Sequence, residues 1–138
     1  MGKRIISSVI LILMKQSVIE QKVLEKIGNP VNFDYPDKPQ FNGHIKDRCV
    51  MLASSWQGGK SADVVDLIEF TEPENFTAIR FGYYNIRGDN EDKLQWASVG
   101  ALTEKVDDMK ELFVKTAREK EWFRCLLEDV VKQVSKND

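Results

Sequence analysis

The stretch IRFGYYNIR constrains the fold more than any other part of the sequence, because its side chains alternate as they do in a strand. It lies within Phe76–Arg87. The alternating sets are Ile79, Phe81 and Tyr83 on one side, and Arg80, Gly82 and Tyr84 on the other. The first set suits a protein core, while the second mixes a cation with an aromatic ring. The sequence therefore predicts a long strand here with two chemically different faces.

Three further segments have the composition of strands and are joined to this one by short turns. They are Ile45–Trp56, Val64–Phe70 and Leu94–Leu102. Gly, Pro, Asn and Asp residues mark the breaks between them. Links this short favour antiparallel pairing, since parallel strands need long crossovers. Residues 61–68 could instead form a short capped helix, but the neighbouring strand patterns favour a strand.

Helical patterns are predicted on both sides of these strands. Residues 1–28 form an N-terminal helical segment that ends at Gly28, and residues 103–136 form C-terminal helices. Thr103 is the expected N-cap, and a phase slip near residues 118–121 predicts a break between two helices. We therefore expect one α+β domain over residues 1–138. Its sheet, residues 44–102, is a four-stranded antiparallel meander packed on one face by the N-terminal and C-terminal helices.

The beginning of the chain carries an apolar run, Ile5–Met14, which follows two basic residues. About ten residues are too few to cross a bilayer, and no small-residue cleavage site follows. We expect this segment to pack on the domain or on a second copy. The two cysteines, Cys49 and Cys125, are far apart and predict reduced, buried thiols in a cytoplasmic protein with no membrane association.

The sequence offers little for catalysis or for a cofactor. Ser54–Ser61 ends in Gly-Lys-Ser but lacks the first glycine of a phosphate-binding loop. His44 is the only histidine, so neither a Cys/His zinc site nor a serine–histidine triad is indicated. Arg87-Gly88-Asp89 is interpreted as a charged turn. A metal-dependent hydrolase or nuclease using Asp37 and Glu91 is a weaker alternative.

The second face of the sheet is the best candidate for binding. An antiparallel sheet can leave one face in water, and a face that mixes arginine with aromatic rings can stack unpaired bases and contact phosphates. The residues expected to do so are Arg48, Trp56, Arg80, Tyr84 and Trp96. Lys46 is expected to share their face. The leading prediction is a non-enzymatic binding protein with single-stranded nucleic acid as its ligand.

The order of elements in Phe76–Leu112 resembles that of the single-stranded-DNA-binding transcription factors of the Whirly and positive-cofactor-four type. An aromatic strand, IRFGYYNIR, is followed by a polar turn, a strand, WASVGAL, and a helix, TEKVDDMKEL. The resemblance is one of architecture over about a quarter of the chain, and it implies that nucleic acid binds on the sheet.

A homo-oligomeric interaction module is the alternative prediction. The apolar segment Ile5–Met14, together with the last helix, would then form the interface. The reason is physical, because an amphipathic element on a small domain needs apolar surface to bury against.

Overall fold

The computed structural model describes residues 18–34, 36–54, 59–86, 94–97 and 101–136. Contacts divide the chain into two compact units, Met1–Leu102 and Thr103–Asp138. The first unit contains the sheet and the second contains two helices.

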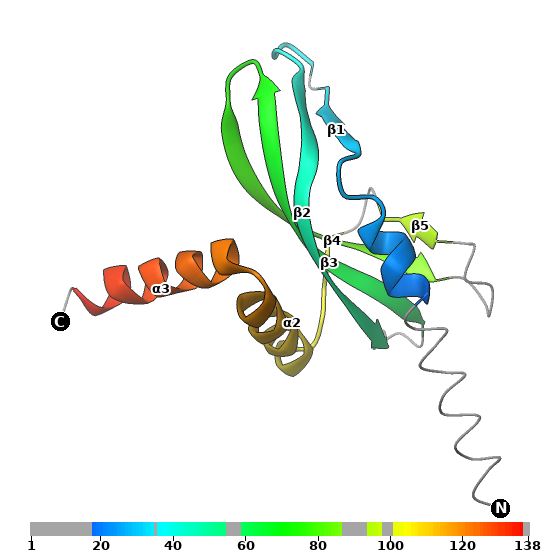
Figure 1. Cartoon of the computed structure of the whole chain (residues 1–138), viewed down its shortest axis with the longest axis vertical. Coiled ribbons are helices and arrows are strands. Elements are labelled where there is room, and N and C mark those ends of the chain that lie inside the picture. The colour runs from blue at the N-terminus through cyan, green and yellow to red at the C-terminus, as the bar shows by residue number, and fades with distance from the viewer. Residues whose placement is uncertain (1–17, 35, 55–58, 87–93, 98–100, 137–138) are drawn as a thin grey trace, which may run out of the picture. The chain divides into compact units, whose positions relative to one another are not determined.

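The sheet unit is an antiparallel meander in which every strand pairs with the next one along the chain. Its strands are β1 (Pro30–Phe33), β2 (Phe41–Ser54), β3 (Lys60–Glu72), β4 (Phe76–Ile86) and β5 (Leu94–Trp96). The three long central strands twist and curve along their length (Figure 1). The α+β class and the antiparallel sheet are as the sequence predicted.

The prediction of four strands was wrong by one. The extra strand, β1, lies in the proline-containing segment between the predicted N-terminal helical segment and the predicted sheet, and it pairs with the first residues of β2. A strand at a sheet edge tolerates proline, because only one side of it needs ladder hydrogen bonds. Residues 61–68, for which a short capped helix was the alternative, belong to β3. They form a strand, which confirms the prediction.

A bulge in β2 changes which side chains share a face. Ile45 pairs with Ile68 and Asp47 pairs with Leu67, so one extra residue of β2 lies between two consecutive pairs. Lys46 contacts Glu69 through a 3.1 Å ion pair, whereas Arg48 pairs with Asp66 on the other face. The prediction that Lys46 and Arg48 share a face was therefore wrong, because strict alternation fails at a bulge.

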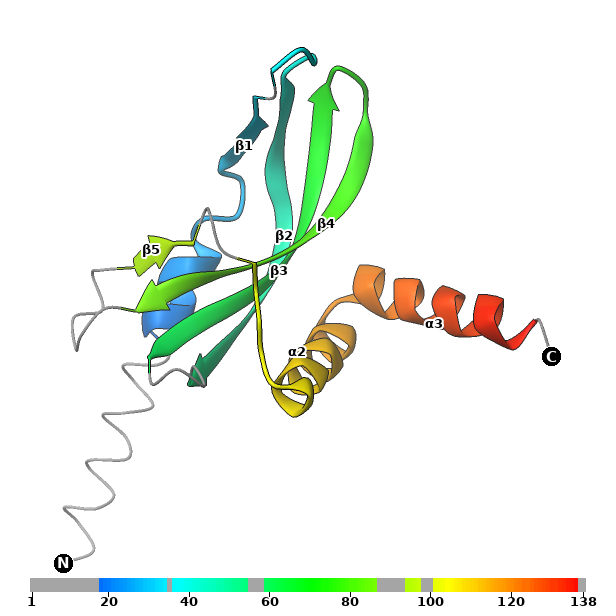
Figure 2. The same ribbon diagram turned by 180° about the vertical axis from the view of Figure 1, so that it is seen from behind.

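A helix over residues 18–24 packs on the face that carries Tyr84 and Trp96. Val23 is fully buried there with Val50, Ala62, Val64 and Tyr84. In both views this helix lies beside the end of the sheet that carries β5 (Figure 1 and Figure 2). This corrects the prediction that the N-terminal helix would cover the opposite face and leave this one open. A second apolar cluster, Val31, Ile45, Ile68 and Phe70, lies toward the other end.

The helical unit consists of α2 (Val106–Glu119) and α3 (Glu121–Ser135). Lys120 has an extended backbone and separates them, which confirms the break that the phase slip predicted. The N-cap of α2 is Lys105, with no side-chain cap bond, so the predicted cap at Thr103 was wrong. No helix within the described ranges has the length and apolar character needed to cross a membrane.

Candidate functional site

A group of charged side chains lies between the two apolar clusters of the sheet, on the face that the 18–24 helix covers in part. Arg48 on β2, Asp66 on β3 and Arg80 on β4 are direct register partners. Directly opposed residues on neighbouring strands point to the same side of a sheet. The register alone therefore brings these three charged side chains together.

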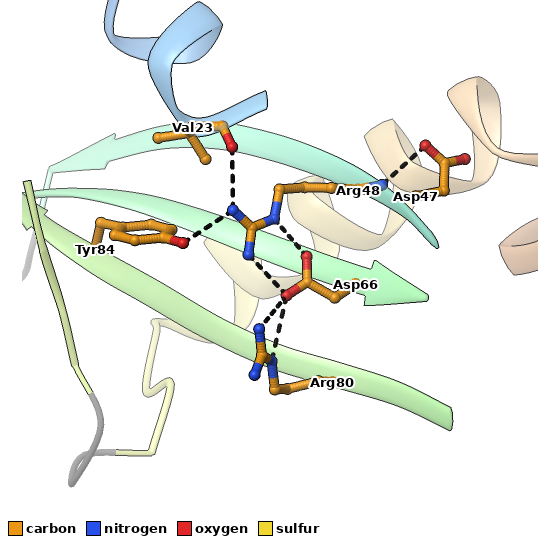
Figure 3. A network of polar contacts seen from close by, with 6 residues as sticks. All are labelled: Val23, Asp47, Arg48, Asp66, Arg80 and Tyr84. Carbon is orange, nitrogen blue, oxygen red and sulfur yellow. Dashed lines mark hydrogen bonds and ion pairs between the residues drawn. The ribbon is translucent and has the colours of Figure 1, made fainter. Parts of the chain in front are cut away.

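Arg48 is the centre of this network, and its side chain has no exposed surface. Its Nε and Nη2 donate to the two carboxylate oxygens of Asp66, at 2.6 and 2.9 Å (Figure 3). Its Nη1 donates to the carbonyl oxygen of Val23 at 3.1 Å and to the hydroxyl of Tyr84 at 2.9 Å. Arg48 thus ties the 18–24 helix to three strands. A buried guanidinium needs such partners to offset the cost of removing it from water.

Asp66 is also fully buried and is shared by two arginines. Arg80 donates to Oδ2 of Asp66 from Nη2 at 2.9 Å and from Nε at 3.3 Å (Figure 3). Among the described residues, Arg80 donates to this carboxylate alone, and its side chain is 23% exposed. Two guanidinium groups against one carboxylate leave one net positive charge. That charge is closest to water at Arg80.

Trp96 supports Arg80 from the edge strand. The Arg80 guanidinium lies over the indole ring, with its Cζ 4.6 Å from the ring centroid. Trp96 also pairs with Tyr84 across β4 and β5 and contacts its ring, with centroids 4.9 Å apart. The indole can lie here only because position 82 is glycine, since a Cβ on Gly82 would lie 2.2 Å from Cη2 of Trp96. The face of the indole attracts the Arg80 guanidinium and helps to orient it.

Burial and pairing act on the pKa of Arg48 in opposite directions. Burial lowers the pKa, but the hydrogen bonds and charge of Asp66, together with Tyr84, outweigh it and raise the pKa above its ordinary value. A raised pKa in the folded state stabilises the fold at every pH below the pKa of the unfolded chain. The stabilisation is lost only as the pH rises through the higher folded value. Arg48 therefore keeps its charge throughout the neutral range.

The structure brings four of the five predicted binding residues together and assigns them different roles. Arg48 and Tyr84 are buried and form the inner part of the network. Arg80 and Trp96 are only partly buried and form its outer part. Trp56 lies outside the described residues. We call Arg80 and Trp96, with Gly82 beneath the indole, the outer platform.

Sequence reasoning missed Asp66, the residue that holds the two arginines. A signal was present, because an aspartate at the centre of VVDLI is unusual in a strand whose neighbours are all apolar. A carboxylate buried there needs a cation and hydrogen-bond donors close by. Arg48 and Arg80 were the available cations, but only the register identifies them as its partners.

Other candidate residues are not gathered into a site. His44 lies on β2, with its Nε2 4.0 Å from a carboxylate oxygen of Glu69. Asp37 lies in the turn between β1 and β2, while Glu91 and the apolar segment Ile5–Met14 lie outside the described residues. Cys49 is buried as expected, but Cys125 is exposed, contrary to the prediction. No group of three or more potential metal ligands occurs within the part of the chain that the structure describes.

Comparisons with protein-family models, with curated proteins and with solved structures found no match to this chain.

Proposed function

We propose that this chain is a non-enzymatic binding protein that holds single-stranded nucleic acid on its outer platform. The observation that carries the proposal is the unbalanced charge of the network. Asp66 neutralises only one of its two arginines, and the partly exposed Arg80 is the one that faces water. A nucleic acid supplies the opposite charge in its phosphates and a flat surface in its bases.

Arg80 can serve both parts of such a ligand. One edge of its guanidinium is occupied by Asp66, and within the described ranges Nη1 donates to no other group, so it can donate to a phosphate oxygen. The plane of the guanidinium already lies over Trp96, and arginine planes also stack on unpaired bases. The resemblance to the Whirly and positive-cofactor-four type supports the same class of ligand. Of the five residues predicted to bind nucleic acid, only Arg80 and Trp96 contact the ligand directly in this proposal. Arg48 and Tyr84 are buried and hold the network in place.

The test measures binding of a short fluorescent oligothymidylate by anisotropy at low salt. Arg80→Gln should weaken binding about tenfold, which is about 1.4 kcal/mol. Lys46→Gln is the matched control, because it also removes one positive charge but lies beside Glu69 on the other face. It should leave the affinity nearly unchanged. Thermal melting of both variants checks that each remains folded.

Two outcomes would overturn the proposal. One is no binding by the wild-type chain at low salt, where phosphate contacts are strongest. The other is an equal loss for Arg80→Gln and Lys46→Gln, which would mean that only overall charge matters. Inorganic polyphosphate serves as a further probe. If it binds as tightly as the oligonucleotide, the bases contribute nothing and the proposed stacking is wrong.

A further inference from the structure

The aromatic pair formed by Tyr84 and Trp96 has a further cation beside it, which comes from the segment that covers part of this face. Nζ of Lys26 lies over the Tyr84 ring, 5.8 Å from the ring centroid. Lys26 lies in the turn between the 18–24 helix and β1. The negative face of an aromatic ring attracts a cation held in this way. The side chain of Lys26 is therefore turned towards the sheet.

The two rings connect Lys26 to Arg80. Cζ of Arg80 lies 4.6 Å from the centroid of the Trp96 ring, and the centroids of Trp96 and Tyr84 are 4.9 Å apart. The path from one cation to the other thus crosses only two rings that contact each other. Successive phosphates lie about 3.4 Å apart along the axis of a stacked strand. A strand of only a few nucleotides can therefore reach both cations.

The surroundings of the aromatic pair are more positive than the chain as a whole. Arg48, Arg80 and Lys26 each carry a positive charge, and all three lie over one of the two rings. Within the described ranges, Asp66 is the one carboxylate paired with their side chains. The whole chain has a net charge of −2. A local excess of positive charge on an acidic chain attracts a polyanion to this face in particular.

Lys26 is available to an incoming anion. Its side chain is partly exposed, and it forms no ion pair with any residue that the structure describes, including its exposed chain neighbour Glu25. A lysine ammonium is a compact charge on a flexible stem, so it can move from the ring to a phosphate without a change in the backbone.

We propose that Lys26 is a second phosphate-binding residue, and that the ligand is a strand long enough to bridge Lys26 and Arg80. This inference rests on the proposed function and adds a requirement for length. One phosphate is held by Arg80, and the strand continues past the aromatic pair to a second phosphate at Lys26. A dinucleotide with a single phosphate can satisfy only one of the two cations. The site would therefore select a strand over a free nucleotide.

Two ligands of different length test the bridge. Binding of a fluorescent hexathymidylate is measured by anisotropy, and an unlabelled thymidine dinucleotide without terminal phosphates is measured by competition. Lys26→Gln should weaken the hexanucleotide about threefold, the share of one phosphate contact. It should leave the dinucleotide unchanged, since that ligand is held at Arg80. Arg80→Gln should weaken both ligands, and Lys46→Gln, which removes the same charge from the other face, should weaken neither.

The dependence of binding on salt counts the phosphate contacts directly. On a single strand each contact contributes about 0.7 to the slope of log K against log salt. Lys26→Gln should reduce the hexanucleotide slope by about that amount. Lys26→Arg keeps the charge, so it should retain both the slope and the affinity of the wild-type chain. Circular dichroism checks that the variants are folded.

The outcomes separate this inference from the proposed function. If Lys26→Gln binds the hexanucleotide with the wild-type affinity and slope while Arg80→Gln does not, the bridge is wrong and the proposed function stands. An equal loss for the two ligands in Lys26→Gln would also overturn the bridge, because Lys26 would then act only through overall charge. A wild-type chain that binds neither ligand would remove the proposed function and the bridge together.

Discussion

The two units of this chain distribute polarity in opposite ways. The sheet unit buries an ion pair, in which Arg48 and Asp66 have no exposed surface. The helical unit leaves Val131 and Val134 more than half exposed. Burying an ion pair is costly, and exposing valine forgoes the stabilisation that burial would give. The sheet unit therefore departs from the simplest arrangement by burying charged side chains, and the helical unit departs from it by exposing apolar ones.

The difference shows where each unit finds its partners. In the sheet unit the register places the carboxylate of Asp66 between two arginines, so the buried Arg48 has its counter-ion on the neighbouring strand. In the helical unit Phe113 and Phe123 meet edge to face at the start of α3. The sheet unit therefore pairs its buried charges across neighbouring strands, whereas the helical unit is held together by aromatic packing where α2 and α3 meet.

Removing the carboxylate of Asp66, which both arginines share, should have the largest effect on the free energy of unfolding. Asp66→Ala leaves the Arg48 guanidinium buried beside Val23 and Tyr84 without a counter-ion. Breaking a buried pair from one side costs about 3–5 kcal/mol. The free energy of unfolding, from urea denaturation followed by circular dichroism, should fall by that amount.

Glu69→Ala provides the control for this substitution. Glu69 is on the same strand and also pairs with a cation of β2, Lys46, but both side chains are exposed. An exposed pair contributes about 0–1 kcal/mol. Similar losses for Asp66→Ala and Glu69→Ala would contradict the view that burial sets the importance of the network.

A methyl group at position 82 should have an intermediate effect. In Gly82→Ala the new Cβ would overlap the indole of Trp96, so the ring must move away from Arg80. Forcing extra volume into a packed site costs about 1–3 kcal/mol. The measurement is again urea denaturation, and trimming the ring with Trp96→Leu should recover part of the loss. If Gly82→Ala/Trp96→Leu loses as much stability as the two single variants lose in total, or more, the clash is not the cause.

The sequence predicted the fold class well because alternation and short turns are local signals. The long strand β4, Phe76–Ile86, and the strand in place of a helix at residues 61–68 both follow from such signals. The break between the last two helices was also predicted, from the phase slip near Lys120. Each of these features depends on side chains within a few residues of one another.

The site was less predictable because it depends on register between strands. Arg48, Arg80, Tyr84 and Trp96 were all selected as members of one face, and the structure does bring them together. Their exposure was misjudged because the partner Asp66 and the covering helix over residues 18–24 come from other segments. The bulge that separates Lys46 from Arg48 has no clear local signal either.

The smallest expected effect concerns an ion pair of the helical unit and extends the comparison to charges on α2. Lys115 Nζ lies 2.9 Å from Oε1 of Glu119, one turn further along the helix, and both side chains are partly exposed. Glu119→Gln should change the free energy of unfolding by only about 0.2–0.5 kcal/mol, because water screens the pair and lysine precedes glutamate, the less favourable order. Thermal melting at low and high salt measures this. A loss approaching that of Asp66→Ala would show that charge is as important to the helical unit as to the sheet unit, and the contrast between the two units would no longer hold.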